Sequence, residues 1–252
     1  MLAKLYLPTG NTRLTLTFLV FATIFPQVVS GIFMGQITFL VFFGVVACMA
    51  LIKKEQWFWA GVILILTTIK PHIANLSVIY LLIYMAQNRQ YQGWAGLAIA
   101  GITCLAVLFI FRPEWLKDLV GLMGIAPVNW ATPTIGGMLS YLNITESARY
   151  LLVIFLPLPF LLAKYPEKFS MEFSVALLTL ITIPATFYGW SYDQTILLIP
   201  IAQIFGWISC LENKVFNIWL AIAMAVSFFV SYYQCAFITN DLYYLWISLF
   251  LL

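Results

Sequence analysis

The feature that most constrains this chain is a series of long apolar runs that follow one another along nearly its whole length. The runs lie at about residues 14–33, 36–52, 57–71, 73–87, 93–111, 148–163, 171–188, 193–209, 215–237 and 241–252. Their apolar residues are continuous and do not alternate with polar ones. That pattern favours helices that cross a lipid bilayer over the strands of a membrane barrel.

The composition also indicates a membrane protein. Hydrophobic residues make up 63% and charged residues 8% of the 252 residues, whereas a soluble protein is roughly 25% charged. So few charges cannot cover a globule of this size with polar surface, which excludes a soluble enzyme and a nucleic-acid binder. The four cysteines lie inside apolar runs without CxxC spacing, and we interpret them as buried small residues with no redox or metal role.

We predict an all-α polytopic protein with a single transmembrane domain over residues 1–252. At about 20 residues per crossing, the chain has room for about nine or ten transmembrane helices. The runs 57–71 and 73–87 are short and are joined through Pro71. Because proline removes a backbone donor and breaks a helix, these runs form either two half-depth helices or one kinked pair.

Residues 112–147 form the one sizeable stretch between apolar runs, and we expect them to make an exterior loop. The stretch begins with an amphipathic helix that lies in the membrane surface and carries Glu114, Lys117 and Asp118 on its polar face. A loop rich in proline, glycine and threonine follows this helix.

The basic residues predict the orientation in the membrane. With the N-terminus in the cytoplasm, the cytoplasmic side carries eight of them, which are Lys4, Arg13, Lys53, Lys54, Arg89, Lys164, Lys168 and Lys214. The exterior side carries four, which are Lys70, Arg112, Lys117 and Arg149. An excess of lysine and arginine is typical of cytoplasmic loops, so this orientation is favoured. The exterior side then holds most of the polar side chains that are suited to chemistry.

Lys70 lies at the end of an apolar run, where a charge is costly unless it meets an anion or a water-filled cavity. It therefore predicts a phosphate site, with His72, the one histidine of the chain, as a second donor or a proton carrier. The alternative is a lysine whose ammonium reaches the headgroups beside a helix-breaking proline.

Asp193 is the one acidic residue near the membrane boundary at the start of the run 193–209. In one interpretation its carboxylate caps a helix and accepts otherwise unpaired backbone N–H groups. In the other it acts as a base, a metal ligand or an acceptor for a sugar hydroxyl.

Five further residues on the exterior side are candidates for binding. Arg112 and Arg149 flank the exterior stretch and either anchor helix ends at the headgroups or bind a lipid phosphate in bidentate fashion. Gln36 either orients a polar ligand or caps a helix. Trp130 and Tyr192 lie in exterior segments, where aromatic rings can stack on a sugar or an isoprenoid.

Four short motifs, taken in order, resemble a known family. They are residues 33–38 (FMGQIT), 68–72 (TIKPH), 133–139 (PTIGGML) and 192–200 (YDQTILLIP). Their order and spacing resemble glycosyltransferase family 87 of the GT-C superfamily, whose best-known members are polyprenyl-phosphate-mannose-dependent enzymes that extend phosphatidylinositol mannosides. The resemblance runs from about residue 27 to about residue 200.

The resemblance implies a GT-C-like helical fold and a hexosyltransferase of the cell envelope. Such enzymes move a sugar from a polyprenyl-phosphate donor to a lipid or glycan acceptor at the outer face. The residues expected to hold the donor phosphate, whose charge grows as it leaves, are Lys70, His72, Arg112 and Arg149. Those expected to contact the substrates are Gln36, Tyr192, Gln194 and Trp130. Asp193 is the candidate catalytic base.

The resemblance also implies no cofactor, because the sugar arrives on a lipid phosphate. No metal-binding residue is predicted, because no pair of acidic residues is spaced to hold a divalent ion. The expected partners are membrane lipid, the polyprenyl-linked sugar and its acceptor, with no nucleic acid, and the expected location is a bacterial plasma membrane. Chains of this family are longer at the N-terminus and carry their catalytic acidic residue there, whereas the first acidic residue here is Glu55. We therefore expect either the donor-binding C-terminal portion of an enzyme, with a second chain supplying the rest, or a non-catalytic binder or transporter of polyprenyl-linked glycans.

Overall fold

The computed structural model describes residues 1–123, 131–210, 214–237 and 240–252, and every regular element among them is helical. In the first half of the chain these elements are α1 (Leu2–Tyr6), α2 (Thr12–Ile24), α3 (Pro26–Phe33), α4 (Thr38–Ile52), α5 (Trp57–Leu64), the 3-10 helices η1 (Ile65–Ile69) and η2 (Pro71–Ile73), α6 (Asn75–Gln87), α7 (Tyr91–Phe111) and α8 (Trp115–Met123). In the second half they are α9 (Ile135–Tyr141), η3 (Ser147–Tyr150), α10 (Leu152–Phe155), α11 (Leu158–Lys164), α12 (Met171–Ala185), η4 (Ser191–Leu197), α13 (Leu198–Cys210), α14 (Lys214–Phe237), η5 (Asp241–Tyr244) and α15 (Leu245–Leu251). The all-α prediction is confirmed.

Each of the ten apolar runs becomes helical, and local signals fix several ends. The Asn11 side chain accepts the N–H of Leu14 and so caps α2, and the Ser170 hydroxyl accepts the N–H of Phe173 and so caps α12. Pro26 occupies the first turn of α3, and the chain bends there by 46° between α2 and α3.

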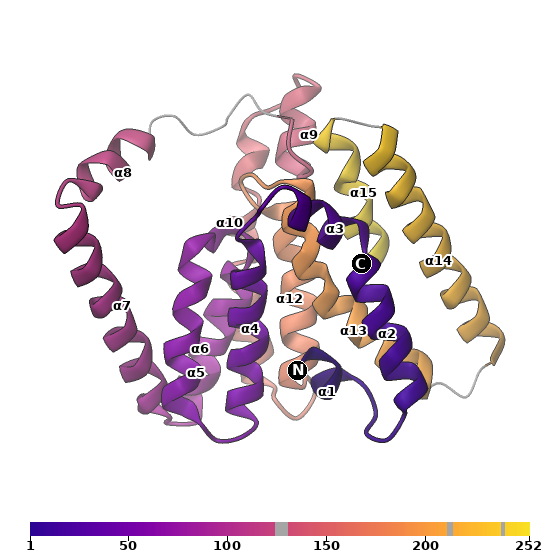
Figure 1. Ribbon diagram of the computed structural model, residues 1–252, viewed down its shortest axis with the longest axis horizontal. Helices are drawn as coiled ribbons and strands as arrows, with labels where there is room; N and C mark the ends of the chain where they lie inside the picture. The colour runs from indigo at the N-terminus through magenta and orange to yellow at the C-terminus, as the bar shows by residue number, and fades with distance from the viewer. Residues whose placement is uncertain (124–130, 211–213, 238–239) are drawn as a thin grey trace.

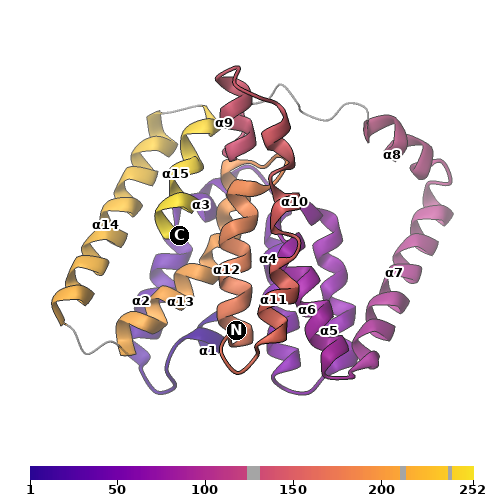
Figure 2. The ribbon, with the colours of Figure 1, turned by 180° about the vertical axis from the view of Figure 1, so that it is seen from behind.

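The core lies where α4, α6, α12 and η4 meet near the middle of the molecule (Figures 1 and 2). Side chains from all four elements, such as Val45, Tyr80, Leu178 and Ile196, are fully buried. Helix α7 with α8 lies apart on one side of this centre, and α14 lies on the other (Figure 1). These outer helices carry mostly exposed apolar side chains, which is typical of helices that face lipid.

Helix α7 is joined to the bundle by a close crossing with α5, which lies near the N-terminal end of α7. A Cβ atom added to Gly61 of α5 would lie 1.8 Å from the carbonyl oxygen of Gly93, and one added to Gly96 would lie 2.1 Å from that of Phe58. Small residues allow helix backbones to approach this closely within a membrane.

Four helical segments in the described residues are long and apolar enough to cross a membrane. They are Tyr91–Phe111, Ser147–Lys164, Ser191–Cys210 and Val215–Phe237, and the bent pair α2–α3 makes a fifth if it counts as one span. The predicted count of nine or ten crossings is therefore not confirmed. The main reason is length, since the 15 residues of α4 rise only about 22 Å against a hydrocarbon core of about 30 Å.

Two other local predictions can be compared with the structure. The predicted break at Pro71 is confirmed, because η1 ends at Ile69 and α6 starts at Asn75. The predicted surface helix is present as α8, whose Lys117 and Asp118 are exposed. Within the predicted loop, residues 131–147 contain the short helix α9, which the Thr134 hydroxyl caps and which was not predicted.

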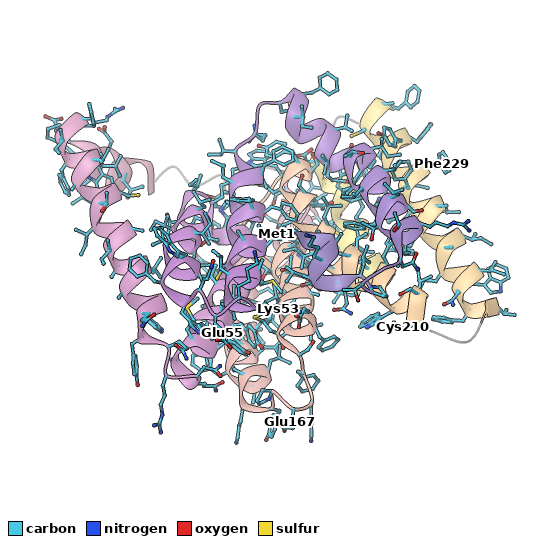
Figure 3. All side chains as sticks on the ribbon, turned by 60° about the horizontal axis from the view of Figure 1, so that its bottom comes forward. Met1, Lys53, Glu55, Glu167, Cys210 and Phe229 are labelled. Atoms are coloured by element: carbon cyan, nitrogen blue, oxygen red, sulfur yellow. The ribbon has the colours of Figure 1, made fainter. Side chains whose placement is uncertain are left out.

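The connections divide between two faces of the molecule. Those near residues 53–56, 88–90 and 165–170 lie on the lower face of Figure 1, and those near 34–37, 70–74 and 186–190 lie on the upper face. Figure 3 turns the lower face forward and shows Lys53, Glu55 and Glu167 there. The two groups of loops that were predicted to lie on opposite sides of the membrane are thus on opposite faces of the fold.

Candidate functional site

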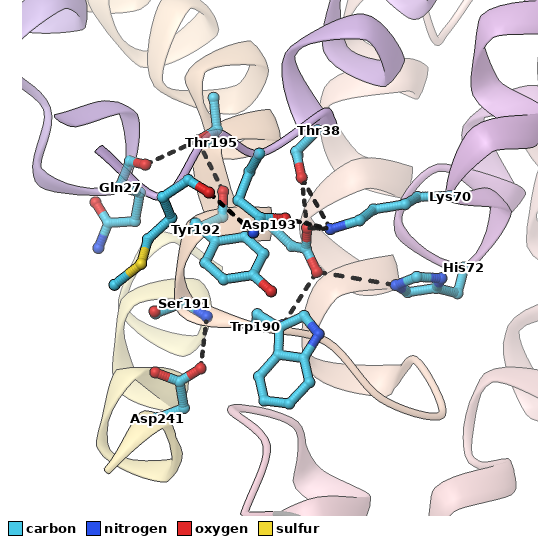
Figure 4. Close-up of polar contacts among 12 residues, drawn as sticks. Gln27, Thr38, Lys70, His72, Trp190, Ser191, Tyr192, Asp193, Thr195 and Asp241 are labelled. Atoms are coloured by element: carbon cyan, nitrogen blue, oxygen red, sulfur yellow. Dashed lines mark hydrogen bonds and ion pairs between the residues drawn. The ribbon is translucent and has the colours of Figure 1, made fainter. Parts of the chain in front are cut away.

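A polar cluster lies under the upper face, where three distant segments of the chain meet (Figure 4). Thr38 begins α4, Lys70 lies in the break between η1 and η2, and Asp193 lies in the first turn of η4. Each of these residues stands at the end of an apolar helix, where the backbone leaves the core and polar side chains can turn inward to one another.

The Asp193 carboxylate is the centre of this cluster. Its Oδ1 atom accepts hydrogen bonds from Thr38 Oγ1 at 2.6 Å and from Lys70 Nζ at 2.8 Å. Its Oδ2 atom accepts the backbone N–H of Trp190 at 3.1 Å. Asp193 is thus the third residue of η4 and accepts the N–H of the N-cap residue Trp190, whereas the capping interpretation had Asp193 as the N-cap itself.

The cluster is a buried ion pair. The exposed fraction is 16% for the Lys70 side chain and 2% for that of Asp193. Taking two charges out of water is costly, and their attraction repays this only when further hydrogen bonds satisfy the remaining donors and lone pairs. Thr38 and Gln36 supply such bonds to Lys70, since Nζ also lies 3.2 Å from Thr38 Oγ1 and 3.4 Å from Gln36 Oε1.

His72 flanks the ion pair on the other side. Its Nε2 atom lies 3.9 Å from Asp193 Oδ2, a distance suited to charge attraction but too long for a hydrogen bond. The ring packs against that of Tyr188 with 4.3 Å between centroids, and the His72 carbonyl accepts a hydrogen bond from Thr186 Oγ1 at 2.9 Å. The segment that follows α12 therefore fixes the imidazole beside the carboxylate.

Two aromatic rings lie next to the ion pair. Lys70 Nζ is 4.8 Å from the centroid of the Tyr192 ring, a cation–π contact. The Trp190 ring lies 6.2 Å from that of Tyr192 at an interplanar angle of 26°. Tyr192 and Trp190 are both half-buried. The ammonium therefore lies beside two aromatic rings that are partly open to the surface.

The structure thus brings Gln36, Lys70, His72, Tyr192 and Asp193 together, as the predicted site requires. Thr38 joins them, although sequence reasoning did not single it out. The sequence feature that could have identified Thr38 is its place in the motif at residues 33–38, where it is a polar residue at the start of an apolar run.

The other predicted residues lie elsewhere or point elsewhere. Gln194 is fully buried, and its Nε2 atom donates to the Tyr244 carbonyl, away from Lys70. Arg112 lies at the α7–α8 corner and pairs with Asp118 at 2.8 Å, with 73% of its side chain exposed. Trp130 lies outside the described residues.

Arg149 is buried beneath the upper face and contacts the segment that positions His72. Its Nη1 atom lies 3.5 Å from the Phe187 carbonyl oxygen. A Cβ atom added to Gly136 would lie 2.6 Å from Arg149 Cα, so the glycines of the motif at residues 133–139 allow α9 to pack directly on η3. This close packing accounts for the presence of small residues in that motif.

Among the described residues, no three histidine, cysteine, aspartate or glutamate side chains gather as a metal ion would need. The site consists of the Lys70 ammonium, which carboxylate, hydroxyl and amide groups hold in place, with two aromatic rings beside it. Such an arrangement can bind a phosphate group that carries an apolar or sugar substituent.

Comparison with protein families finds a match for this chain. No curated protein and no solved structure matches the chain. The sequence model of glycosyltransferase family 87 matches residues 2–190, well over half of the chain, and this segment includes Thr38, Lys70 and His72. The chain therefore belongs to glycosyltransferase family 87.

Proposed function

We propose that this membrane glycosyltransferase binds a polyprenyl-phosphate-linked hexose at the Lys70–Asp193 cluster and takes part in moving the hexose to a lipid or glycan acceptor. Family membership and the apolar helices support the coarse assignment to membrane glycosyltransferases. The observation that carries the finer assignment is the partly buried ammonium of Lys70, held at the end of apolar helices with aromatic rings beside it.

A lysine in this position suits a phosphate leaving group. In the transfer, the bond between the anomeric carbon and the phosphate oxygen breaks and its electron pair stays on the phosphate, while the acceptor oxygen bonds to that carbon and its proton passes to the departing phosphate. Negative charge grows on the departing lipid phosphate, and a cation already fixed in a site of low polarity stabilises it strongly. His72, 3.9 Å from Asp193, supplies a second nitrogen beside the same pair.

Asp193 was the candidate base, and its geometry favours a different role. Both carboxylate oxygens already accept hydrogen bonds, one from Lys70 and Thr38 and the other from Trp190. A base needs a lone pair within reach of the acceptor hydroxyl. We infer that Asp193 positions the Lys70 ammonium.

The membrane setting of the proposal follows from charge. The upper face, which holds the cluster, has four of the twelve basic residues in its predicted loops, and the opposite face has eight. This asymmetry supports an exterior site and a cytoplasmic N-terminus. The proposed partners are bilayer lipid and the polyprenyl-linked sugar, and the proposed location is a bacterial plasma membrane. The lipid-linked sugar would be a substrate, and the proposal needs no cofactor.

The test is binding of farnesyl phosphate, a short polyprenyl phosphate, to the full chain in detergent. We expect the double variant Lys70→Met/Asp193→Asn, which removes both charges together, to bind at least tenfold more weakly than the wild type. Lys168→Ala, an exposed cation on the opposite face, serves as the control and should bind normally. Equal affinity of the wild type and the double variant would overturn the proposal.

A second candidate function is a non-catalytic binder or transporter of polyprenyl-linked glycans. The burial and hydrogen bonding of Asp193 favour it, because three donors already contact this carboxylate and only 2% of the side chain is exposed to an acceptor. The discriminating measurement is transfer of labelled mannose from farnesyl-phosphate mannose to octyl mannoside. Transfer that the double variant loses supports the enzyme, whereas farnesyl phosphate binding without any transfer supports the binder.

A further inference from the structure

A second carboxylate lies close to the cluster and comes from the far end of the chain. Asp241 begins η5, well beyond the segment that the family comparison covers. Its Oδ2 atom accepts the backbone N–H of Ser191 at 3.2 Å, while Asp193 Oδ2 accepts the N–H of the preceding residue, Trp190, at 3.1 Å. The two carboxylates therefore bind consecutive amides of one short segment.

The position of Asp241 is fixed by the elements around it. Gln194 Nε2 donates to the Tyr244 carbonyl at 3.0 Å, which joins η5 to η4. Gln234 Nε2 donates to the Tyr243 carbonyl at 3.0 Å, which joins η5 to α14. A binding residue gains precision when neighbouring hydrogen bonds hold its backbone in this way.

Asp241 differs from Asp193 in how open it is. Asp193 is buried, and both of its oxygens are engaged. Asp241 is half-buried, and Ser191 is its one hydrogen-bond partner among the described residues. A carboxylate has about four lone-pair sites, so Asp241 retains capacity to accept hydrogen bonds from a ligand.

The aromatic side chains near Asp193 and Asp241 complete the surface on which a ligand can bind. Figure 4 shows the rings of Tyr192 and Trp190 between Lys70 and Asp241. The ammonium contacts the Tyr192 ring, the Trp190 ring lies beside that ring, and Asp241 is bonded to the amide of Ser191, which lies between these two residues in the chain. A hexosyl phosphate presents an anion, an apolar ring face and hydroxyl donors, which match these groups in turn.

We propose that Asp241, with the Trp190–Tyr192 ring pair, binds hydroxyl groups of a hexose next to the phosphate site. The proposal rests on the proposed function, because it takes Lys70 as the phosphate end of the ligand. The negative charge of Asp241 repels a phosphate and attracts hydroxyl donors, so it also orients the ligand along the surface. The hexose belongs either to the donor or to the acceptor, and both present the same hydroxyl chemistry.

The test measures the affinity of the full chain in detergent for farnesyl phosphate, farnesyl-phosphate mannose and octyl mannoside. Asp241→Asn keeps an oxygen that accepts the Ser191 N–H but loses the charge, so the fold is retained. Losing one charge-assisted hydrogen bond weakens binding by about tenfold. We expect that loss for a sugar-bearing ligand, with farnesyl phosphate unaffected, and the ligand that responds identifies the hexose as that of the donor or of the acceptor.

Glu167→Gln removes an exposed carboxylate on the opposite face and is the matched control. The inference is overturned if Asp241→Asn leaves both sugar-bearing ligands unchanged, or if it weakens farnesyl phosphate by the same factor, which indicates a structural role. Failure of the wild type to bind farnesyl phosphate would instead count against the proposed phosphate site, so the two failures are distinguishable.

Discussion

Replacing Lys70 with methionine should destabilise the protein strongly, because it leaves the Asp193 charge buried without its partner. The ion pair is 2.8 Å long, and only 2% of the Asp193 side chain is exposed, so water cannot replace the ammonium. Breaking a buried pair by removing one partner costs about 3–5 kcal/mol. We expect that loss in the free energy of unfolding of Lys70→Met.

Adding Asp193→Asn to that variant should restore most of the stability. The asparagine carries no charge, and its side-chain oxygen can still accept the hydrogen bond from Thr38. Replacing both members of a buried pair by uncharged groups of similar volume is often close to neutral. The double variant should therefore lie within about 1–2 kcal/mol of the wild type.

The assay is equilibrium unfolding in mixed micelles with a rising fraction of denaturing detergent, followed by tryptophan fluorescence and circular dichroism. Arg112→Met is the matched control, because Arg112 pairs with Asp118 while 73% of its side chain and 44% of that of Asp118 are exposed. Exposed pairs contribute up to about 1 kcal/mol. The reasoning is refuted if Lys70→Met costs no more than this control, or if Asp193→Asn fails to recover stability.

Three further predictions concern the crossing of α5 and α7, Arg112 at the α7–α8 corner, and Thr38 in the polar cluster. Gly61→Ala should destabilise by about 1–3 kcal/mol in the same unfolding assay, since its Cβ would meet the α7 backbone at 1.8 Å, whereas Gly101→Ala, with 3.7 Å to its nearest neighbour, should be neutral. Arg112→Ala should leave farnesyl phosphate binding within twofold of the wild type, because this arginine pairs with a residue of its own corner; a tenfold loss would place it in the donor site. Thr38→Val should cost about 1.5–3 kcal/mol of unfolding free energy through the lost 2.6 Å bond to Asp193, and a cost below 0.5 kcal/mol would contradict this account.

The sequence predicted helical segments well, because a continuous apolar run has few alternatives to a helix in lipid. It also predicted the break at Pro71, since a missing backbone donor is a local property. The number of crossings is different. It depends on how far each helix extends along the membrane normal, and α4 shows that an apolar run can end well short of the bilayer thickness.

The candidate site was predicted as a set of residues and not as a set of contacts. Lys70 and Asp193 were each recognised from the cost of a charge at the end of an apolar run, but they lie 123 residues apart, and nothing local states that they neutralise each other. Arg112 was grouped with them because arginine suits phosphate, whereas it pairs with Asp118 six residues away. Asp241 was not among the candidate site residues, and its link to Ser191 became visible only in the fold.

The mutual neutralisation of Lys70 and Asp193 has an electrical consequence. A transmembrane voltage acts on net charge, with about 2.3 kcal/mol for each elementary charge moved across 100 mV. The opposite charges of this pair lie 2.8 Å apart, so the forces that a voltage exerts on them nearly cancel. The packing of α4 against η4 therefore does not depend on the membrane potential. In the proposed function, a bound lipid phosphate would give the cluster a net negative charge, so the occupied cluster would respond to voltage and the empty one would not.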